Sequence, residues 1–141
     1  MMMKERQINT KYYSITINKI KNRIIIKPIG FWRSVNTVPN YLDSIFQAID
    51  RDLMRHFMVV LEISEMLTHP ADVQEKIHYH GVMEILKRKP KALVVVMPQD
   101  DISFMQANFL NKKVGLPMKS FETLAEAEAF LDAYATKHGL L

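Results

Sequence analysis

The sequence predicts an α/β domain with a mixed five-stranded sheet, an N-terminal β-hairpin followed by parallel strands, packed with about four helices in the order ββαβαβαβα. Two runs typical of strands follow each other near the N-terminus. After them, β-branched runs alternate with segments of helical periodicity, and such strand–helix–strand crossovers make the connected strands parallel. The almost wholly apolar run 92–97 is typical of a central strand that is covered on both faces.

The first two strands are expected over 13–18, where apolar and polar residues alternate, and over 23–29, which contains three consecutive isoleucines. The short polar connection 19–22 indicates that they form a hairpin. Pro39 suits the first turn of a helix, and the residues after it repeat at three- and four-residue spacing. The apolar face of that helix should comprise Leu42, Ile45, Phe46, Ile49 and Leu53.

A third strand is expected over 57–63, and the turn-like stretch 64–70 offers Thr68 or His69 as the N-cap of the next helix. That helix should run over about 71–89, because acidic residues open it and basic residues close it, as the helix dipole favours. Its core face is predicted to comprise Ile77, Gly81, Val82, Ile85 and Leu86.

The remaining elements follow the fourth strand, 92–97. Asp100 or Asp101 can cap a third helix with Ile102, Met105 and Phe109 directed inward. A short strand over 118–121 then leads into a last helix that ends near His138. Its capping box is Thr123 with Glu126, and its buried stripe is predicted to be Leu124, Ala127, Leu131 and Tyr134.

The composition fits one folded domain, which we place at residues 12–139 after a tail over 1–11. Hydrophobic residues make up 48% of the chain and charged residues 24%, far from the balance of disordered chains. The chain has no cysteine, which excludes disulfides, thiolate metal sites and cysteine nucleophiles and favours a cytoplasmic location. We expect no export signal and no transmembrane segment.

The net charge of +4 is distributed unevenly along the chain. Residues 1–33 hold eight basic residues and one acid, whereas the rest holds eleven basic residues and fourteen acids. A basic N-terminal face could bind nucleic acid, but we favour solvated side chains that protect a sheet edge, so nucleic acid is not an expected partner. The side chains in question are Lys19, Lys21, Arg23 and Lys27.

No motif predicts catalysis, a cofactor or a metal ion. The glycines are too far apart for a phosphate-binding loop, and no serine lies in a nucleophile elbow. His78 and His80 would point about 200° apart on a helix, so they cannot share one metal ion. His80 and Glu84 have a permissive spacing but supply only two ligands, and a hydrogen bond on the helix surface is the favoured interpretation.

Polar side chains gather where two parallel strands end, which is the usual place for function in α/β sheets. The candidate partner or ligand surface comprises Glu62, Ser64, Glu65, Thr68, Asp100 and Asp101, although the two aspartates also suit helix capping. An adaptable apolar pocket is an alternative to simple core packing. Its candidate residues are Phe31, Trp32, Phe104 and Phe109.

The element order and the closing segment 121–131, FETLAEAEAFL, resemble the SpoIIAA-like branch of the STAS superfamily. This resemblance implies a regulatory module that binds a protein partner and catalyses nothing. The family's phosphorylated Asp-Ser-Ser/Thr-Gly turn has no counterpart in 64–70, where Thr68 is the nearest hydroxyl and a helix cap is its expected role.

We therefore expect a non-enzymatic interaction module with an unidentified protein partner. A carrier or sensor of a small apolar, lipid-like ligand is the alternative, and nucleic-acid binding through the basic N-terminal face is the second. A homodimer is left open, and no cofactor is expected.

Overall fold

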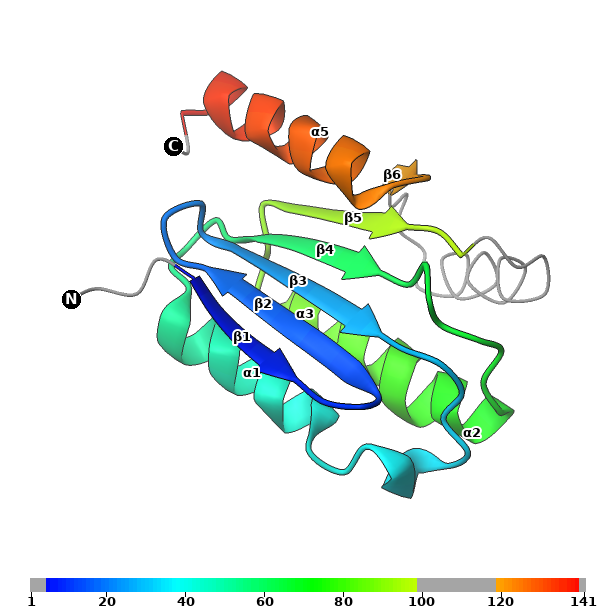
Figure 1. The fold of residues 1–141 in the computed structure, drawn as a ribbon. Coiled ribbons are helices and arrows are strands. Elements are labelled where there is room, and N and C mark those ends of the chain that lie inside the picture. Colours follow the sequence, from blue (N-terminus) through cyan, green and yellow to red (C-terminus); the bar gives the residue numbers. More distant parts are fainter. Residues whose placement is uncertain (1–4, 99–118, 140–141) are drawn as a thin grey trace.

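The computed structural model describes residues 5–98 and 119–139. Within these ranges one mixed sheet has the spatial order β1-β2-β3-β4-β5-β6 (Figure 1). The β1–β2 and β2–β3 pairs are antiparallel and the three later pairs are parallel, which confirms the predicted hairpin and parallel crossovers. The strands are β1 (Glu5–Asn9), β2 (Tyr13–Asn18), β3 (Arg23–Pro28), β4 (Met58–Glu62), β5 (Ala92–Val96) and β6 (Lys119–Phe121).

The described sheet has six strands, and not the predicted five, because β1 lies in the stretch that we expected to be a tail. This strand contains one apolar residue, Ile8, so it lacks the alternating pattern that marks a strand in a sequence. It forms against the open edge of β2, where Ile8 lies opposite Ile15 and Arg6 opposite Ile17. Long-range backbone pairing therefore stabilises a segment with little strand signal of its own.

Helices cover both faces of the sheet (Figure 1). On one face lie α1 and a continuous helical segment made of α2, η2 and α3, and on the other lies α5. The predicted helix with Asp100 or Asp101 as its cap falls outside the described residues. The bounds are η1 (Val35–Thr37), α1 (Tyr41–Asp52), α2 (Ala71–Val73), η2 (Gln74–Tyr79), α3 (His80–Lys87) and α5 (Leu124–Lys137).

Successive side chains of a strand point to opposite faces of the sheet, so the protein has an apolar core on each face. Beneath α1 and α3 lie Ile15, Ile17, Ile24, Ile26 and Val59. On the α5 side, β4 and β5 pack against small and medium side chains of the helix, namely Ala127, Leu131 and Ala135. Of the predicted α5 stripe, Leu124 and Tyr134 are only half-buried, because the helix approaches the sheet through its alanines.

The segment from Ala71 to Lys87 is helical throughout, but Gln74–Tyr79 forms π-helix and not α-helix. Pro70 occupies the N-cap position and makes no side-chain cap bond, so the prediction that Thr68 or His69 caps this helix is wrong. The π-type turns are wider than α-turns and are frequent at functional sites. Here Ile77 and His78, adjacent in sequence, are both buried.

Acidic side chains from distant parts of the chain pair with the cations of the N-terminal strands and their turn. Arg6 and Lys19 pair with Asp52 at the end of α1, and Lys27 pairs with Glu65. Arg23 is 1% exposed at the start of β3, where its Nη2 donates to Asp132 Oδ1 of α5 over 2.9 Å. The basic N-terminal region and the acidic remainder of the sequence thus meet in space.

Candidate functional site

The exits of β3 and β4 meet at the carboxyl edge of the sheet. After β4, a turn closes with a hydrogen bond from Met66 N to Ile63 O of 3.2 Å. Met66 then forms a parallel bridge with Gly30, in which Gly30 N donates to Glu65 O over 2.9 Å and Leu67 N donates to Gly30 O over 3.0 Å. Gly30 has a φ of +72°, a conformation that glycine adopts without strain.

The bridge brings the next two residues, Phe31 and Leu67, to neighbouring backbone positions on the surface. Each side chain is 51% exposed. Single exposed apolar side chains are common, but two large ones on adjoining segments form a small apolar surface that solvent does not favour. We call Phe31 and Leu67 the edge patch.

Three of the predicted surface residues lie together in the segment that precedes this patch. Ser64 Oγ donates to Glu62 Oε1 over 3.4 Å, and Glu65 forms an ion pair with Lys27 of β3. The hydrogen bond to Glu65 raises the pKa of Lys27. Thr68 follows Leu67 in the same loop, whereas the predicted Asp100 and Asp101 fall outside the described residues. The patch is therefore bordered by polar groups, which include the Lys27–Glu65 ion pair and the Glu62 carboxylate.

A stack of three rings supports the loop from inside. Trp32, which is completely buried, stacks on His69 at a centroid distance of 4.9 Å and on His78 at 5.2 Å. The Trp32 indole Nε1 donates to Tyr12 O at 3.1 Å and to Ile29 O at 3.2 Å. Phe31 of the edge patch meets His69 edge-on at 6.3 Å. The exposed patch thus rests on a packed aromatic base.

The two histidines are joined by a hydrogen bond whose direction follows from their neighbours. His69 Nε2 lies 2.9 Å from Gly30 O, and a carbonyl can only accept, so this nitrogen carries the proton. In the neutral ring His69 Nδ1 is then an acceptor, and His78 Nε2–H donates to it over 2.8 Å. Burial lowers the pKa of His78 to about 3 and also lowers the pKa of His69. Both rings are therefore neutral at neutral pH.

These contacts connect three parts of the chain that are remote in sequence. His69 belongs to the loop after β4, His78 belongs to η2, and Gly30 follows β3. A neutral, hydrogen-bonded pair of this kind is suited to holding a loop in place. The histidine pair and Trp32 thus give the edge patch a fixed shape.

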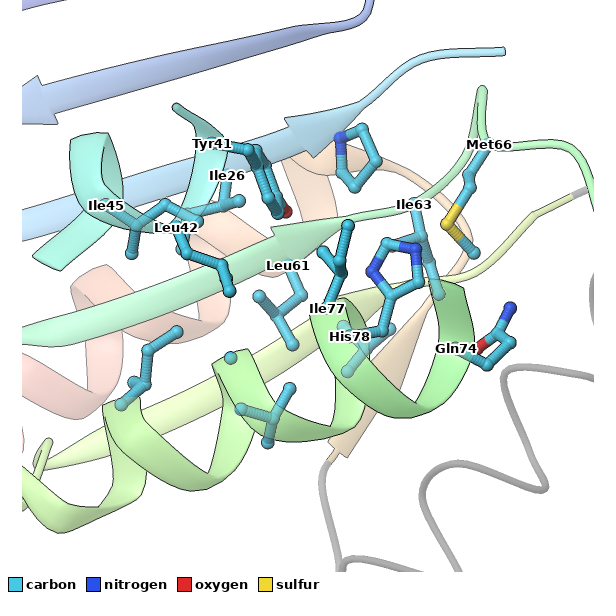
Figure 2. A pocket seen from close by; sticks show the side chains of 15 residues that line it. Ile26, Tyr41, Leu42, Ile45, Leu61, Ile63, Met66, Gln74, Ile77 and His78 are labelled. Carbon is cyan, nitrogen blue, oxygen red and sulfur yellow. The ribbon is translucent and has the colours of Figure 1, made fainter. Parts of the chain in front are cut away.

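A cavity of about 40 Å³ lies next to this stack, between the sheet, α1 and the η2–α3 helix (Figure 2). Its walls are mainly aliphatic, and its three polar residues are Tyr41, Gln74 and His78. Burial raises the pKa of the Tyr41 hydroxyl. The aliphatic wall includes Ile26, Leu42, Ile45, Leu61, Ile63, Ile77, Val82, Ile85 and Val95.

The structure describes two of the four residues of the predicted apolar pocket, Phe31 and Trp32. Trp32 is buried beside the histidines but does not line the cavity, and Phe31 lies on the surface. Phe104 and Phe109 fall outside the described residues. Across 5–98 and 119–139, no three His, Asp or Glu side chains are placed to hold a metal ion.

The sequence does not predict the contacts that His69, His78 and Gln74 make in this region. The helical spacing predicts that His78 and His80 point in different directions. In the structure His78 is buried and His80 is exposed. The hydrogen bond between His78 and His69 forms where the loop after β4 meets the helix, and the spacing of the two residues in the sequence does not predict it. The only local signal is that Phe31 and Trp32 directly follow Gly30, which places two large rings at a turn.

A scan against protein-family models finds no match, and searches of curated proteins and of solved structures find no significant match either. In the described part of the chain, none of the helices has the length and apolar character needed to cross a membrane. The functional assignment therefore depends on the residues and geometry of the site.

Proposed function

We propose that the chain is a non-enzymatic interaction module of STAS type that binds a protein partner through the edge patch. The observation that carries this proposal is that two half-exposed residues, Phe31 and Leu67, lie on adjoining segments at the carboxyl edge of the sheet, with Phe31 against His69 of the buried ring stack. Interface centres are enriched in aromatic and apolar anchors, and their rims are polar. The edge patch and its border have this composition.

The polar groups at this edge favour binding over catalysis, because structural contacts occupy them. Glu65 is paired with Lys27, Glu62 accepts from Ser64, and His69 bonds to Gly30 and His78. A general base needs a proton acceptor directed at a substrate. The groups that could titrate here are instead used to fix the loop.

The partner should present an apolar side chain flanked by a cation. The apolar side chain would cover Phe31 and Leu67, and the cation would meet the Glu62 carboxylate, since Glu65 is already paired with Lys27. Burying such a patch removes apolar surface from water, which supplies affinity, while the charges orient the partner. Nucleic acid is not the favoured partner of this face, because Lys27 is already paired with Glu65 and Glu62 adds a negative charge.

The test compares affinity captures from a lysate of the cells that make the protein. The bait variant Phe31→Ser/Leu67→Ser removes the patch, and Ile20→Ser/Met54→Ser is the matched control. Ile20 and Met54 are large apolar side chains that are 59% and 76% exposed, but they lie at the opposite end of the sheet, beside the β2–β3 turn.

We expect one protein in near-equal amount to the bait with the wild type and with the control, and its loss with the patch variant. Recovery of the same protein by the patch variant, or repeated recovery of the bait alone, contradicts the proposal. Sedimentation of the purified wild type separates a heterologous partner from a second copy of the chain. A patch-dependent dimer would make this face a self-association surface and would refute the heterologous assignment.

A further inference from the structure

Two protruding apolar side chains lie at the end of the sheet opposite to the edge patch. Met54 and Ile20 are 76% and 59% exposed, the highest values among the large apolar side chains of the described residues. Met54 follows α1, and Ile20 lies in the turn between β2 and β3, at the end where β3, β4 and β5 begin (Figure 1). Water does not favour two such side chains in one region.

Hydrogen bonds join the loops at this end into one surface. Asn22 of the β2–β3 turn accepts from Met54 N at its Oδ1 over 2.7 Å, and its Nδ2 donates to Arg55 O over 2.9 Å. In the next loop, Lys91 N donates to Phe57 O over 2.8 Å. The turn, the loop after α1 and the loop after α3 are therefore neighbours.

Four exposed cations belong to the same end, and within 5–98 and 119–139 none of them forms an ion pair. One comes from the last turn of α1 and the others from the two loops. They are Arg51, Arg55, Lys89 and Lys91, which together with Ile20 and Met54 we call the basic end.

The aspartates near the basic end do not neutralise it, because other cations already pair with them. Glu5, at the start of β1, has no such partner in the described part of the chain, so four free cations face one free acid. The surface is therefore positively charged. The occupied acids are Asp50 with Arg88, Asp52 with Arg6 and Lys19, and Asp132 with Lys21 and Arg23.

Lys89 carries its charge at a backbone position that favours glycine. Its φ is +56°, and it directly follows the C-cap of α3, where glycine is the usual residue in this conformation. Lysine is strained there. Contact of the ammonium group with an anionic partner would offset that strain.

The occupant must accept cations and aliphatic side chains together. An anionic bilayer does both, because its headgroups attract Lys and Arg and its interfacial layer takes up apolar side chains. Nucleic acid supplies phosphates, but its bases stack on aromatic rings. Among the described residues the one exposed Phe, Tyr or Trp is Phe31, at the other end of the sheet.

We infer that the basic end binds the surface of a bilayer that contains anionic lipid, with Ile20 and Met54 in the headgroup layer and the four cations beside lipid phosphates. Such binding is peripheral and reversible. It does not depend on the protein-binding function proposed above. In lysates cleared of membranes, only the edge patch would have a partner, so the two surfaces can be tested separately.

Co-sedimentation with lipid vesicles measures this binding. We expect the intact protein to sediment with phosphatidylcholine vesicles that contain about 30% phosphatidylserine, and not with phosphatidylcholine alone. Raising the salt from about 0.1 M to about 0.5 M should weaken the binding, because the Debye length shortens.

Charge variants locate the surface. Arg55→Gln/Lys91→Gln should weaken binding about 25-fold, since each cation beside an anionic surface contributes about fivefold. Lys11→Gln/Lys76→Gln, the matched control, removes the same charge from exposed positions elsewhere and should change binding less than about twofold. Lys89→Gly should weaken binding about fivefold while relieving backbone strain, which separates lost affinity from lost stability.

A fluorescent label tests the insertion of Met54. The chain has no cysteine, so Met54→Cys can be labelled at one position with a nitrobenzoxadiazole dye. Its fluorescence should rise with the anionic vesicles, whereas the same label at Leu67→Cys of the edge patch should not respond.

No sedimentation with the anionic vesicles, or an equal loss of binding in the two double variants, overturns the proposal. An unchanged Met54→Cys label on bound protein overturns the orientation. Binding of a single-stranded oligonucleotide that needs Arg55 and Lys91, without binding of vesicles, would assign the surface to nucleic acid and refute the lipid partner.

Discussion

Protonation of the buried histidine pair should reduce the stability of the protein in mildly acidic solution. The pKa of His78 is about 3 in the folded protein because of burial, against the ordinary 6.5 of the unfolded chain. As the pH falls below 6.5, the His78 ring therefore takes up a proton in the unfolded state but stays neutral in the folded state. The stabilising contribution is complete above pH 6.5 and is lost progressively as the pH approaches 3.

The size of the effect follows from these two pKa values. Between about pH 7 and pH 5, linkage gives a loss of about 2 kcal/mol in the free energy of unfolding from His78 alone. His69 adds to the loss, because burial lowers its pKa too. Carboxylates contribute little in this window. The ordinary pKa values of Asp and Glu are 3.8 and 4.5, already below this window. Hydrogen bonds from Arg88 and Lys87 lower the pKa values of Asp50 and Glu84 further.

Urea denaturation followed by the fluorescence of Trp32 measures this loss, since Trp32 is the only tryptophan and stacks on both histidines. The variant His69→Gln/His78→Gln keeps hydrogen-bonding side chains without a titrating ring, and it should lose less than about 0.5 kcal/mol over the same pH range. His80→Gln, on the exposed face of α3, should retain the wild-type dependence. The reasoning is refuted if the double variant and the wild type respond equally to pH.

Further substitutions test the backbone, ion-pair and packing arguments. Gly30→Ala should destabilise by about 1–2 kcal/mol in urea denaturation, with Gly30→Asn costing less, because φ is +72° and no atom lies within 4 Å of the new Cβ. Asp132→Ala should cost about 2–3 kcal/mol because it leaves the buried Arg23 charge with only the more distant Glu128, whereas Arg23→Met should cost under about 1 kcal/mol. Equal losses in the free energy of unfolding for Asp132→Ala and Arg23→Met would contradict the argument that the buried, uncompensated charge is the main cost. Gly81→Ala should change the free energy of unfolding by less than about 1 kcal/mol in urea denaturation, since helix propensity offsets the displacement of Leu42.

Much of the fold could be predicted because its signals are local. The three consecutive isoleucines of β3 and the apolar run of β5 indicated their strands without any knowledge of neighbours. Thr123 likewise marked the start of α5, where its Oγ1 accepts from Glu126 N over 3.2 Å. These features depend on residues within one turn or one strand.

The features that were missed depend on partners far along the chain. β1 exists because β2 offers an open edge, and its own sequence is mostly polar. The unequal charge of the two parts of the sequence suggested a basic face, yet Arg6, Arg23 and Lys27 each meet an acid that lies more than thirty positions away. Pairing over such distances has no local signature.

In the candidate site, too, the local features could be predicted and the contacts between distant segments could not. The sequence placed Glu62, Ser64 and Glu65 at the end of a parallel strand, and the structure places them there. It did not associate Phe31 with Leu67, because the Gly30–Met66 bridge that joins them is an isolated contact beyond the strands. The role of His69 was also hidden, since a histidine before a proline is equally compatible with a helix cap.

Site-specific photo-crosslinking tests the central claim about the edge patch most directly. A benzophenone amino acid replaces Phe31 in one bait and Ile20 in another, both positions being more than half exposed. On irradiation in the native lysate, we predict one covalent adduct of defined mass at position 31 and none at position 20. The same adduct at both positions, or no adduct at position 31, would contradict a partner-binding surface at the carboxyl edge of this sheet.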